Sequence, residues 1–221
     1  ELTSPCFYCI IVFVLTTLHS FKMANYLDAK DLVALDEYRR KIFALRAEAY
    51  AKFKIDVLDN DTLSALSIYE VVSQYDEDYN INFSRNGEDG KSLVETKTGT
   101  PKEIFIEQKA SRIEKKKRSG MYPSAGFQFH AMGNIEYDRY IFAARDKGTL
   151  ELVRIYDISF KENTKLVQKH LLGERAKWED KNKKLGRTQK HDGIIMPEDV
   201  LISGLKNATK IIIKGVEVIK A

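Results

Sequence analysis

The stretch DGKSLVETKTGTPKEIFIEQK (residues 89–109) decides how this chain is expected to fold. Two runs of strand-forming residues, 91–97 and 102–109, flank the turn-forming sequence TGTP at 98–101. Two such runs around a short loop that contains glycine are typical of a β-hairpin. We therefore expect an antiparallel pair of strands at this place in the chain.

The position of the turn predicts which side chains of the hairpin lie together. With the turn centred on residue 100, Leu93 faces Glu107 and Lys91 faces Lys109. Side chains alternate between the two faces of a sheet, so the odd-numbered residues of both strands share one face. Two acids and two lysines are thus expected to gather at the end of the hairpin away from its turn: Asp89, Lys91, Glu107 and Lys109.

Two acids beside a lysine suit metal-dependent cleavage of a phosphodiester bond. A hard cation such as Mg²⁺ takes carboxylate oxygens, usually one or two from the protein, and keeps water and phosphate as its other ligands. Such an ion lowers the pKa of bound water, and a neighbouring lysine neutralises charge in the transition state. The competing interpretation is a set of cross-strand ion pairs, each contributing only about 0–1 kcal/mol when exposed.

A second acid-x-lysine sequence, ETK at 95–97, stands closer to the turn. In the predicted register Lys97 pairs with Glu103 across the strands, which explains this sequence without a function. Lys109 instead leads into a long crossover and a buried strand. We therefore favour residues 107–109 as the site.

The rest of the chain alternates between helical and strand-like patterns. Helices are expected where apolar residues recur near a 3.6-residue period, and strands where short apolar runs lie between turn residues. The expected helices are 28–54, a second that follows a cap in DNDT (59–62), and 161–184; the expected strands outside the hairpin are 81–84, 127–134, 138–145, 150–158, 193–202 and 208–220. This order predicts an α/β or α+β domain around a mixed sheet.

Length and composition suit one folded domain. With 221 residues, of which 43% are hydrophobic, the chain can bury a core, which argues against intrinsic disorder. The net charge of +4 is mild and does not by itself indicate a nucleic-acid partner. The only two cysteines, Cys6 and Cys9, complete neither a zinc site nor a disulfide framework, and a chain otherwise free of cysteine suits a cytoplasmic enzyme.

The first 22 residues differ from the rest of the chain. They contain the apolar run PCFYCIIVFVLTTL (5–18), which is shorter than the roughly 20 residues that a membrane-spanning helix needs. We expect residues 1–22 to be a non-native or disordered extension, and residues 23–221 to form a single domain that starts near Met23. A membrane anchor is the alternative interpretation of this run.

The order of these motifs resembles the PD-(D/E)XK nuclease superfamily, and type II restriction endonucleases in particular. The resemblance rests on three segments: EDGKSLVETK (88–97), EIFIEQKAS (103–111) and FQFHAMGNIEYDRYIFAARDKGTLELVRIYDI (127–158). The family core runs helix, three-strand meander, helix, strand, with an acid at the start of the second strand and (D/E)-x-K at the end of the third. Over roughly residues 62–160, the resemblance implies a restriction-endonuclease-like core with a mixed central β-sheet flanked by helices.

The resemblance also implies a role for each residue of the motif. Asp89, which stands 18 residues before Glu107, would bind Mg²⁺ together with Glu107 and the backbone carbonyl of Gln108, and Mn²⁺ would substitute. Lys109 would position the attacking water. The family's proline before the first acid is missing, since position 88 is a glutamate. The acids at positions 70 and 88 are therefore candidates for an auxiliary role: Glu70 and Glu88.

Two basic segments are candidates for DNA contacts, although a basic run by itself is more often a solvated face. Phosphate contacts are expected directly after the proposed catalytic lysine, from Ser111, Arg112, Lys115, Lys116, Lys117 and Arg118. Base-reading donors are expected in GRTQKHD (186–192), from Arg187, Gln189, Lys190 and His191; a plain polar connector is the alternative. His130 is expected to pack or to cap rather than to catalyse.

Taken together, the motif and the resemblance imply a Mg²⁺-dependent, sequence-specific endodeoxyribonuclease that acts on double-stranded DNA. A homodimer and a cognate DNA methyltransferase are the expected partners, with no membrane association. One alternative keeps the fold and changes the task to a repair nuclease or junction resolvase. Another is a non-catalytic nucleic-acid-binding protein.

Overall fold

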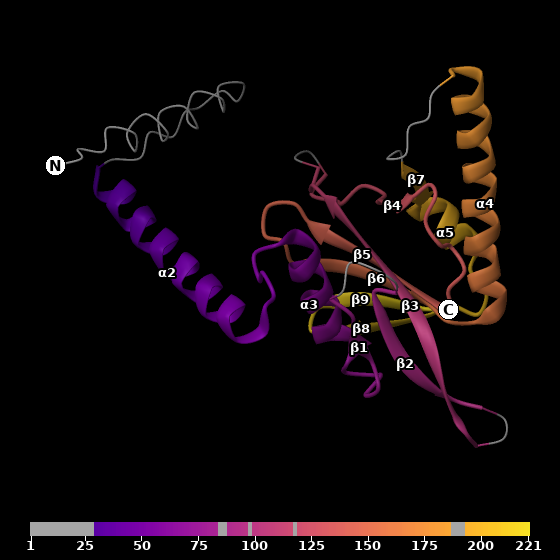
Figure 1. Cartoon of the computed structure of the whole chain (residues 1–221), viewed down its shortest axis with the longest axis horizontal. Coiled ribbons are helices and arrows are strands. Elements are labelled where there is room, and N and C mark those ends of the chain that lie inside the picture. Colours follow the sequence, from indigo (N-terminus) through magenta and orange to yellow (C-terminus); the bar gives the residue numbers. More distant parts are fainter. Residues whose placement is uncertain (1–28, 84–87, 97–98, 117–118, 187–192) are drawn as a thin grey trace. The chain divides into compact units, whose positions relative to one another are not determined.

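The computed structural model describes residues 29–83, 88–96, 99–116, 119–186 and 193–221 (Figure 1). The chain divides into two compact units, Glu1–Lys54 and Ile55–Ala221. In the first unit the helix α2 runs from Ala29 to Phe53, which confirms the helix expected there. The apolar run before it lies outside the described residues. None of the helices described is long and apolar enough to cross a membrane.

The second unit is built on a mixed sheet with the strand order β1-β2-β3-β5-β6-β9-β8 (Figure 1). The pairs β3–β5 and β6–β9 are parallel, and the other neighbours are antiparallel. The strands are β1 (Asn80–Ile81), β2 (Gly90–Glu95), β3 (Pro101–Ile113), β5 (Arg139–Asp146), β6 (Leu152–Ile158), β8 (Thr209–Ile213) and β9 (Val216–Lys220). The mixed central sheet predicted from the sequence is confirmed.

Helix α3 (Asn60–Val72) covers one face of this sheet. It starts at the predicted cap, where the carboxylate of Asp59 accepts hydrogen bonds from the N–H groups of Asp61 (3.1 Å) and Thr62 (3.2 Å). Its buried side chains pack on the apolar residues of the sheet that point to the same side; this cluster includes Ile68, Val71, Val72, Ile106, Ile141, Ala143 and Ile155. The polar start of α3 is thus anchored by its cap, and the C-terminal half of the helix is anchored by burial.

The opposite face of the sheet carries the larger core. It is covered by the helices α4 (Lys161–Lys184) and α5 (Glu198–Gly204) and by a separate two-stranded sheet of β4 (Gly126–His130) and β7 (Gly193–Pro197). Aromatic residues from β4 and β5 form its centre, among them Phe127, Phe129, Tyr140 and Phe142. The odd-numbered side chains of β3 point to this face, because Glu107 lies beside Tyr140 of this core in the parallel register.

The hairpin of β2 and β3 forms, but its predicted register is wrong. Lys91 lies opposite Phe105 rather than Lys109, because the connecting loop is centred two residues earlier than expected. Gly99 in this loop takes a positive φ of 75°, and Pro101 already starts β3. Proline has no N–H to donate to the hydrogen-bond ladder, so it is excluded from the middle of a sheet but tolerated at the first position of a strand. The shift moves strand pairs by an even number of residues, so every side chain keeps its predicted face.

The corrected register changes which charges pair across the hairpin. Lys91 forms an exposed ion pair of 2.9 Å with Glu103. Lys97, the partner predicted for Glu103, lies outside the described residues. At the other end, the N–H of Asp89 donates to the carbonyl of Ile106 (3.0 Å), which already lies opposite Gly90, so the ladder becomes irregular just before β2. The structure therefore leaves Lys91 out of the group and brings Asp89 closer to it.

Three further elements differ from the expected ones. The segment 208–220, expected as one strand, forms the two antiparallel strands β8 and β9. The parallel crossover from β3 to β5 contains the strand β4 and, in its described part, no helix, whereas the nuclease family has a helix there. The segment 193–202, expected as one strand, ends as β7 at Pro197 and continues as α5. Proline fits at a helix start, and the acids of the first turn, Glu198 and Asp199, suit the positive end of a helix.

Candidate active site

Three charged side chains meet where β2 begins beside the middle of β3. Asp89 directly precedes β2, while Glu107 and Lys109 stand two residues apart on β3 and project from the same face. The Nζ atom of Lys109 lies 3.3 Å from Oδ2 of Asp89 and also forms an ion pair with Oε1 of Glu107. Lys109 therefore bridges two carboxylates. These are the three residues for which the sequence predicts catalysis.

Burial increases across this cluster from Asp89 to Glu107. The side chain of Asp89 is 41% exposed, that of Lys109 is 23% exposed and that of Glu107 is 9% exposed. On the buried side, the Nζ atom of Lys109 lies 5.4 Å from the centre of the Phe129 ring, and the hydroxyl of Tyr137 acts to lower the pKa of Glu107. Aromatic side chains thus border one side of the cluster, and Asp89 opens the other side to solvent.

The charges of the cluster influence one another strongly. Burial raises the pKa of Glu107, the attraction of Lys109 opposes this, and the repulsion of Asp89 adds to the rise. For Lys109, burial lowers the pKa, but the two carboxylates together outweigh it, so its pKa lies above the ordinary value. The two carboxylates thus favour the ammonium form of Lys109.

The oxygen donors of the cluster fit a hard divalent cation such as Mg²⁺. Asp89 and Glu107 supply two carboxylates close enough for their repulsion to raise the pKa of Glu107, and a cation would relieve this repulsion. Across the part of the chain that the structure describes, no group of three or more His, Cys, Asp and Glu side chains could hold a metal. Two carboxylates are the number that Mg²⁺ commonly takes when water and phosphate complete its shell.

The side chain of Gln108 is a part of the site that sequence reasoning missed. Its backbone N–H donates to Oδ2 of Asp89 (2.8 Å), and its side-chain Nε2 donates to the carbonyl of Asp89 (3.2 Å). Gln108 is only 8% exposed, and its Oε1 atom has no hydrogen-bond partner among the described residues. A buried acceptor without a partner costs about 1–3 kcal/mol. The signal in the sequence was that Gln108 is a polar residue with the same strand parity as the apolar residue Ile106.

Gly90, next to Asp89, has no room for a side chain. A Cβ atom there would lie 2.8 Å from the carbonyl oxygen of Asn80 and 3.2 Å from Nε2 of Gln108. We expect Gly90→Ala to lower the free energy of unfolding by about 1–3 kcal/mol, because the backbone of β1 must move to admit the methyl group. Urea denaturation followed by circular dichroism measures this change.

Gly173, inside α4, is the matched control for Gly90. A Cβ atom at Gly173 meets nothing within 4 Å. Gly173→Ala should therefore stabilise the protein by about 0.5–1 kcal/mol, since alanine favours a helix interior. Equal effects of the two substitutions on stability would contradict the close contacts of Gly90 with Asn80 of β1 and Gln108 of β3.

The two candidate auxiliary acids do not join the cluster in the structure. Glu70 lies on α3, which packs on the other face of the sheet from Glu107, and it forms an exposed ion pair of 2.9 Å with Lys214. At position 88 the backbone carbonyl accepts a hydrogen bond from Asn82 (2.9 Å), and the acid that contacts Lys109 is Asp89. Asp89 is thus the better ligand candidate of the two neighbouring acids.

The basic residues after Lys109 lie partly within β3, because this strand continues to Ile113. Ser111 is half-buried and has the strand parity of Lys109, so it projects from the same face. The charged members of the segment that the structure describes are exposed, namely Arg112, Lys115 and Lys116. Lys117, Arg118 and the predicted base-reading residues Arg187, Gln189, Lys190 and His191 lie outside the described residues. His130 accepts a hydrogen bond from the N–H of Met132 (3.3 Å), in keeping with a capping role.

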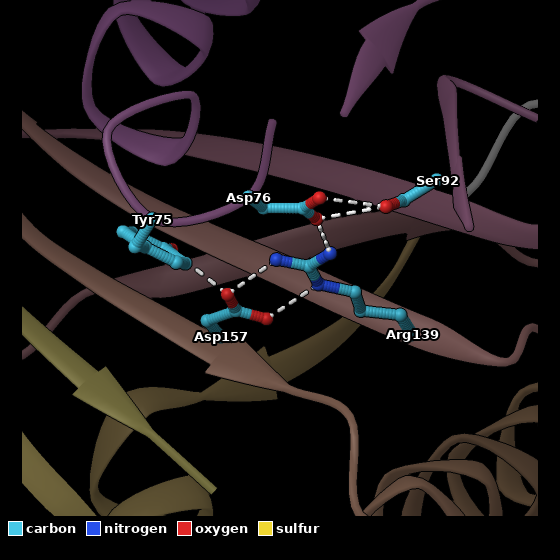
Figure 2. Close-up of polar contacts among 5 residues, drawn as sticks. All are labelled: Tyr75, Asp76, Ser92, Arg139 and Asp157. Atoms are coloured by element: carbon cyan, nitrogen blue, oxygen red, sulfur yellow. Dashed lines mark hydrogen bonds and ion pairs between the residues drawn. The ribbon is translucent and has the colours of Figure 1, made fainter. Parts of the chain in front are cut away.

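A second charged cluster lies under α3 and was not foreseen (Figure 2). Arg139 forms two hydrogen bonds with Asp157, of 2.7 and 2.6 Å, and an ion pair with Asp76. The hydroxyl of Tyr75 donates to Asp157 (2.8 Å), and that of Ser92 donates to Asp76 (2.8 Å). Arg139 is 6% exposed and Asp157 is 1% exposed. We interpret this buried and well-satisfied network as part of the fold rather than as a site.

Comparison with known proteins identified no similar protein. No family model matches the chain, and no curated protein or solved structure does so either. A functional proposal therefore rests on the geometry of Asp89, Glu107 and Lys109 and on the sequence motif that these residues form.

Proposed function

We propose that this chain is a Mg²⁺-dependent endodeoxyribonuclease that hydrolyses double-stranded DNA at specific sequences, as type II restriction endonucleases do. The observation that carries the proposal is the bridge of Lys109 between Asp89 and Glu107 on neighbouring strands. Two acids and a lysine with this spacing are the motif of the PD-(D/E)XK nucleases, which the sequence resembles.

In this proposal each residue of the cluster has one task. Asp89 and Glu107 would hold the cation, together with the backbone carbonyl of Gln108, and Mn²⁺ would substitute for Mg²⁺. The bound ion would acidify a water ligand and stabilise charge on the phosphate. Lys109, which forms ion pairs with both acids, would orient the attacking water and neutralise the negative charge that develops on the phosphoryl oxygens.

Exposed basic residues after Lys109 are the candidates for phosphate contacts, with Arg112 on the α3 face of the sheet because its strand parity is opposite to that of Lys109. Arg112, Lys115 and Lys116 follow Lys109 on β3 and the chain after it, and all three are exposed. Such contacts supply affinity without sequence information, so binding should weaken steeply as the salt concentration rises. A homodimer, which would cut both strands of a palindromic site, and a cognate methyltransferase belong to the same proposal.

Digestion of a plasmid of known sequence tests this function directly. The full chain is incubated with the plasmid and Mg²⁺, with EDTA in a parallel sample, and the ends of the products are sequenced. We expect discrete fragments with a common end sequence, only in the sample with free Mg²⁺. Cleavage confined to branched or damaged DNA would favour a resolvase or repair nuclease. Salt-dependent DNA binding without any cleavage would overturn the enzymatic proposal in favour of a binding protein.

A further inference from the structure

Gln108 stands between the two functional residues of β3 but faces the opposite way. Glu107 and Lys109 project toward the aromatic core, whereas the side chain of Gln108 projects to the face that α3 covers. Its neighbours along this face of β3 and β5 are Ile106 and Ile141, both fully buried. An apolar side chain of the same length would suit these surroundings.

The contacts of Gln108 converge on Asp89. The backbone N–H holds the carboxylate of Asp89 at 2.8 Å, and the side-chain amide holds its carbonyl at 3.2 Å. Gln108 thus forms hydrogen bonds with both the side chain and the main chain of Asp89. The absence of a side chain at Gly90 makes this possible, since a Cβ atom there would lie 3.2 Å from Nε2 of Gln108.

The two polar atoms of the Gln108 side-chain amide differ in their contacts. Of its two polar atoms, Nε2 reaches Asp89, whereas Oε1 is buried and finds no partner among the residues that the structure describes. A buried acceptor in this condition destabilises the folded state, and an apolar replacement of similar shape removes the penalty. Among the described residues, the hydrogen bond to the carbonyl of Asp89 is therefore the one polar contact that the side-chain amide of Gln108 makes.

We propose that Gln108 is a positioning residue that holds Asp89 at the separation from Glu107 and Lys109 that metal binding needs. This inference rests on the proposed function and adds to it a role for the side chain between the two motif residues. The amide acts through Asp89 and does not touch the metal or the DNA. Partners of this kind orient metal ligands, and their loss typically weakens metal affinity by about 10- to 100-fold.

Gln108→Met separates positioning from a structural role. Methionine fills a similar volume and lacks both the donor and the buried acceptor. We expect a melting temperature equal to or above that of the wild type and Mn²⁺ binding weakened by about 10-fold or more, measured by isothermal titration calorimetry on the full chain. In cleavage assays the Mg²⁺ concentration for half-maximal rate should rise, and saturating Mg²⁺ should restore most of the rate.

Gln74→Met is the matched control, because Gln74 is an exposed glutamine whose side-chain amide donates to the carbonyl of Glu70 in α3 (3.4 Å). It should leave Mn²⁺ affinity and cleavage unchanged. If wild-type protein binds Mn²⁺ and Gln108→Met binds it equally well, the positioning role is overturned and the nuclease function stands. A lower melting temperature for Gln108→Met would assign the amide to the fold. If wild-type protein neither binds Mn²⁺ nor cleaves, the proposed function fails and its positioning residue with it.

Discussion

Lys109→Met should reduce Mg²⁺-dependent cleavage of duplex DNA by roughly 100- to 1,000-fold, the loss expected when one preorganised charge at a transition state is removed. The ammonium of Lys109 lies between both carboxylates, and these two acids raise its pKa. Methionine is unbranched and only one atom shorter than lysine, and it removes the charge. Glu107→Gln should cause a loss of similar size by removing a metal ligand.

The same hairpin offers matched controls for these two variants. Lys91 and Glu103 form an exposed ion pair on β2 and β3, with side chains 49% and 46% exposed. Lys91→Met and Glu103→Gln should leave cleavage unchanged, because an exposed pair contributes only about 0–1 kcal/mol to stability. Circular dichroism spectra and gel-shift binding at equal salt concentration show whether each variant keeps its fold and its DNA affinity. Full activity of Lys109→Met and Glu107→Gln would remove the cluster from the proposal.

Arg139→Met should lower the free energy of unfolding by about 3–5 kcal/mol, the usual cost of removing one partner from a buried ion pair. Asp157 would remain 1% exposed without its cation, and Asp76 would lose the same partner (Figure 2). Urea denaturation measures the change. The effect should extend to β2, because Asp76 also accepts hydrogen bonds from Ser92 on that strand.

Lys214→Met is the control for the loss of a cation. Lys214 pairs with Glu70 at 2.9 Å, but both side chains are at least half exposed, so its removal should change stability by less than about 1 kcal/mol. The comparison tests whether burial, rather than the number of ion pairs, governs stability here. A change of less than 1 kcal/mol for Arg139→Met, with no difference from Lys214→Met, would contradict the structural role of the network.

Local patterns were enough to find the core of the candidate site. Glu107 and Lys109 stand two residues apart in a strand, and this spacing alone places them on one face. The hairpin brought Asp89 next to Lys109 in spite of the error in register, because Asp89 directly precedes the strand that pairs with β3. Lys91 was misplaced by the same error, since its neighbours depend on the register itself and not only on its parity.

Contacts between distant segments could not be read from the chain. Arg139 meets Asp76 and Asp157 from separate elements, and nothing in the sequence around any of the three marks the others as partners. The pairing of β4 with β7 and the burial of Glu198 beneath Arg154 depend on tertiary packing in the same way. The helix α5 replaced part of an expected strand because apolar residues at 200–202 suit either structure, and Pro197 ends the strand before them.

The sequence by itself determined the class of the fold, the hairpin and the group of two acids and a lysine, because periods of two and 3.6 residues and turn composition are properties of neighbouring residues. Only the tertiary structure decided the register of the hairpin and showed that Asp89, rather than Glu88, contacts Lys109. The hydrogen bonds between Gln108 and Asp89 also depend on the tertiary structure. These depend on side-chain packing across strands, where one loop residue more or less changes which atoms meet.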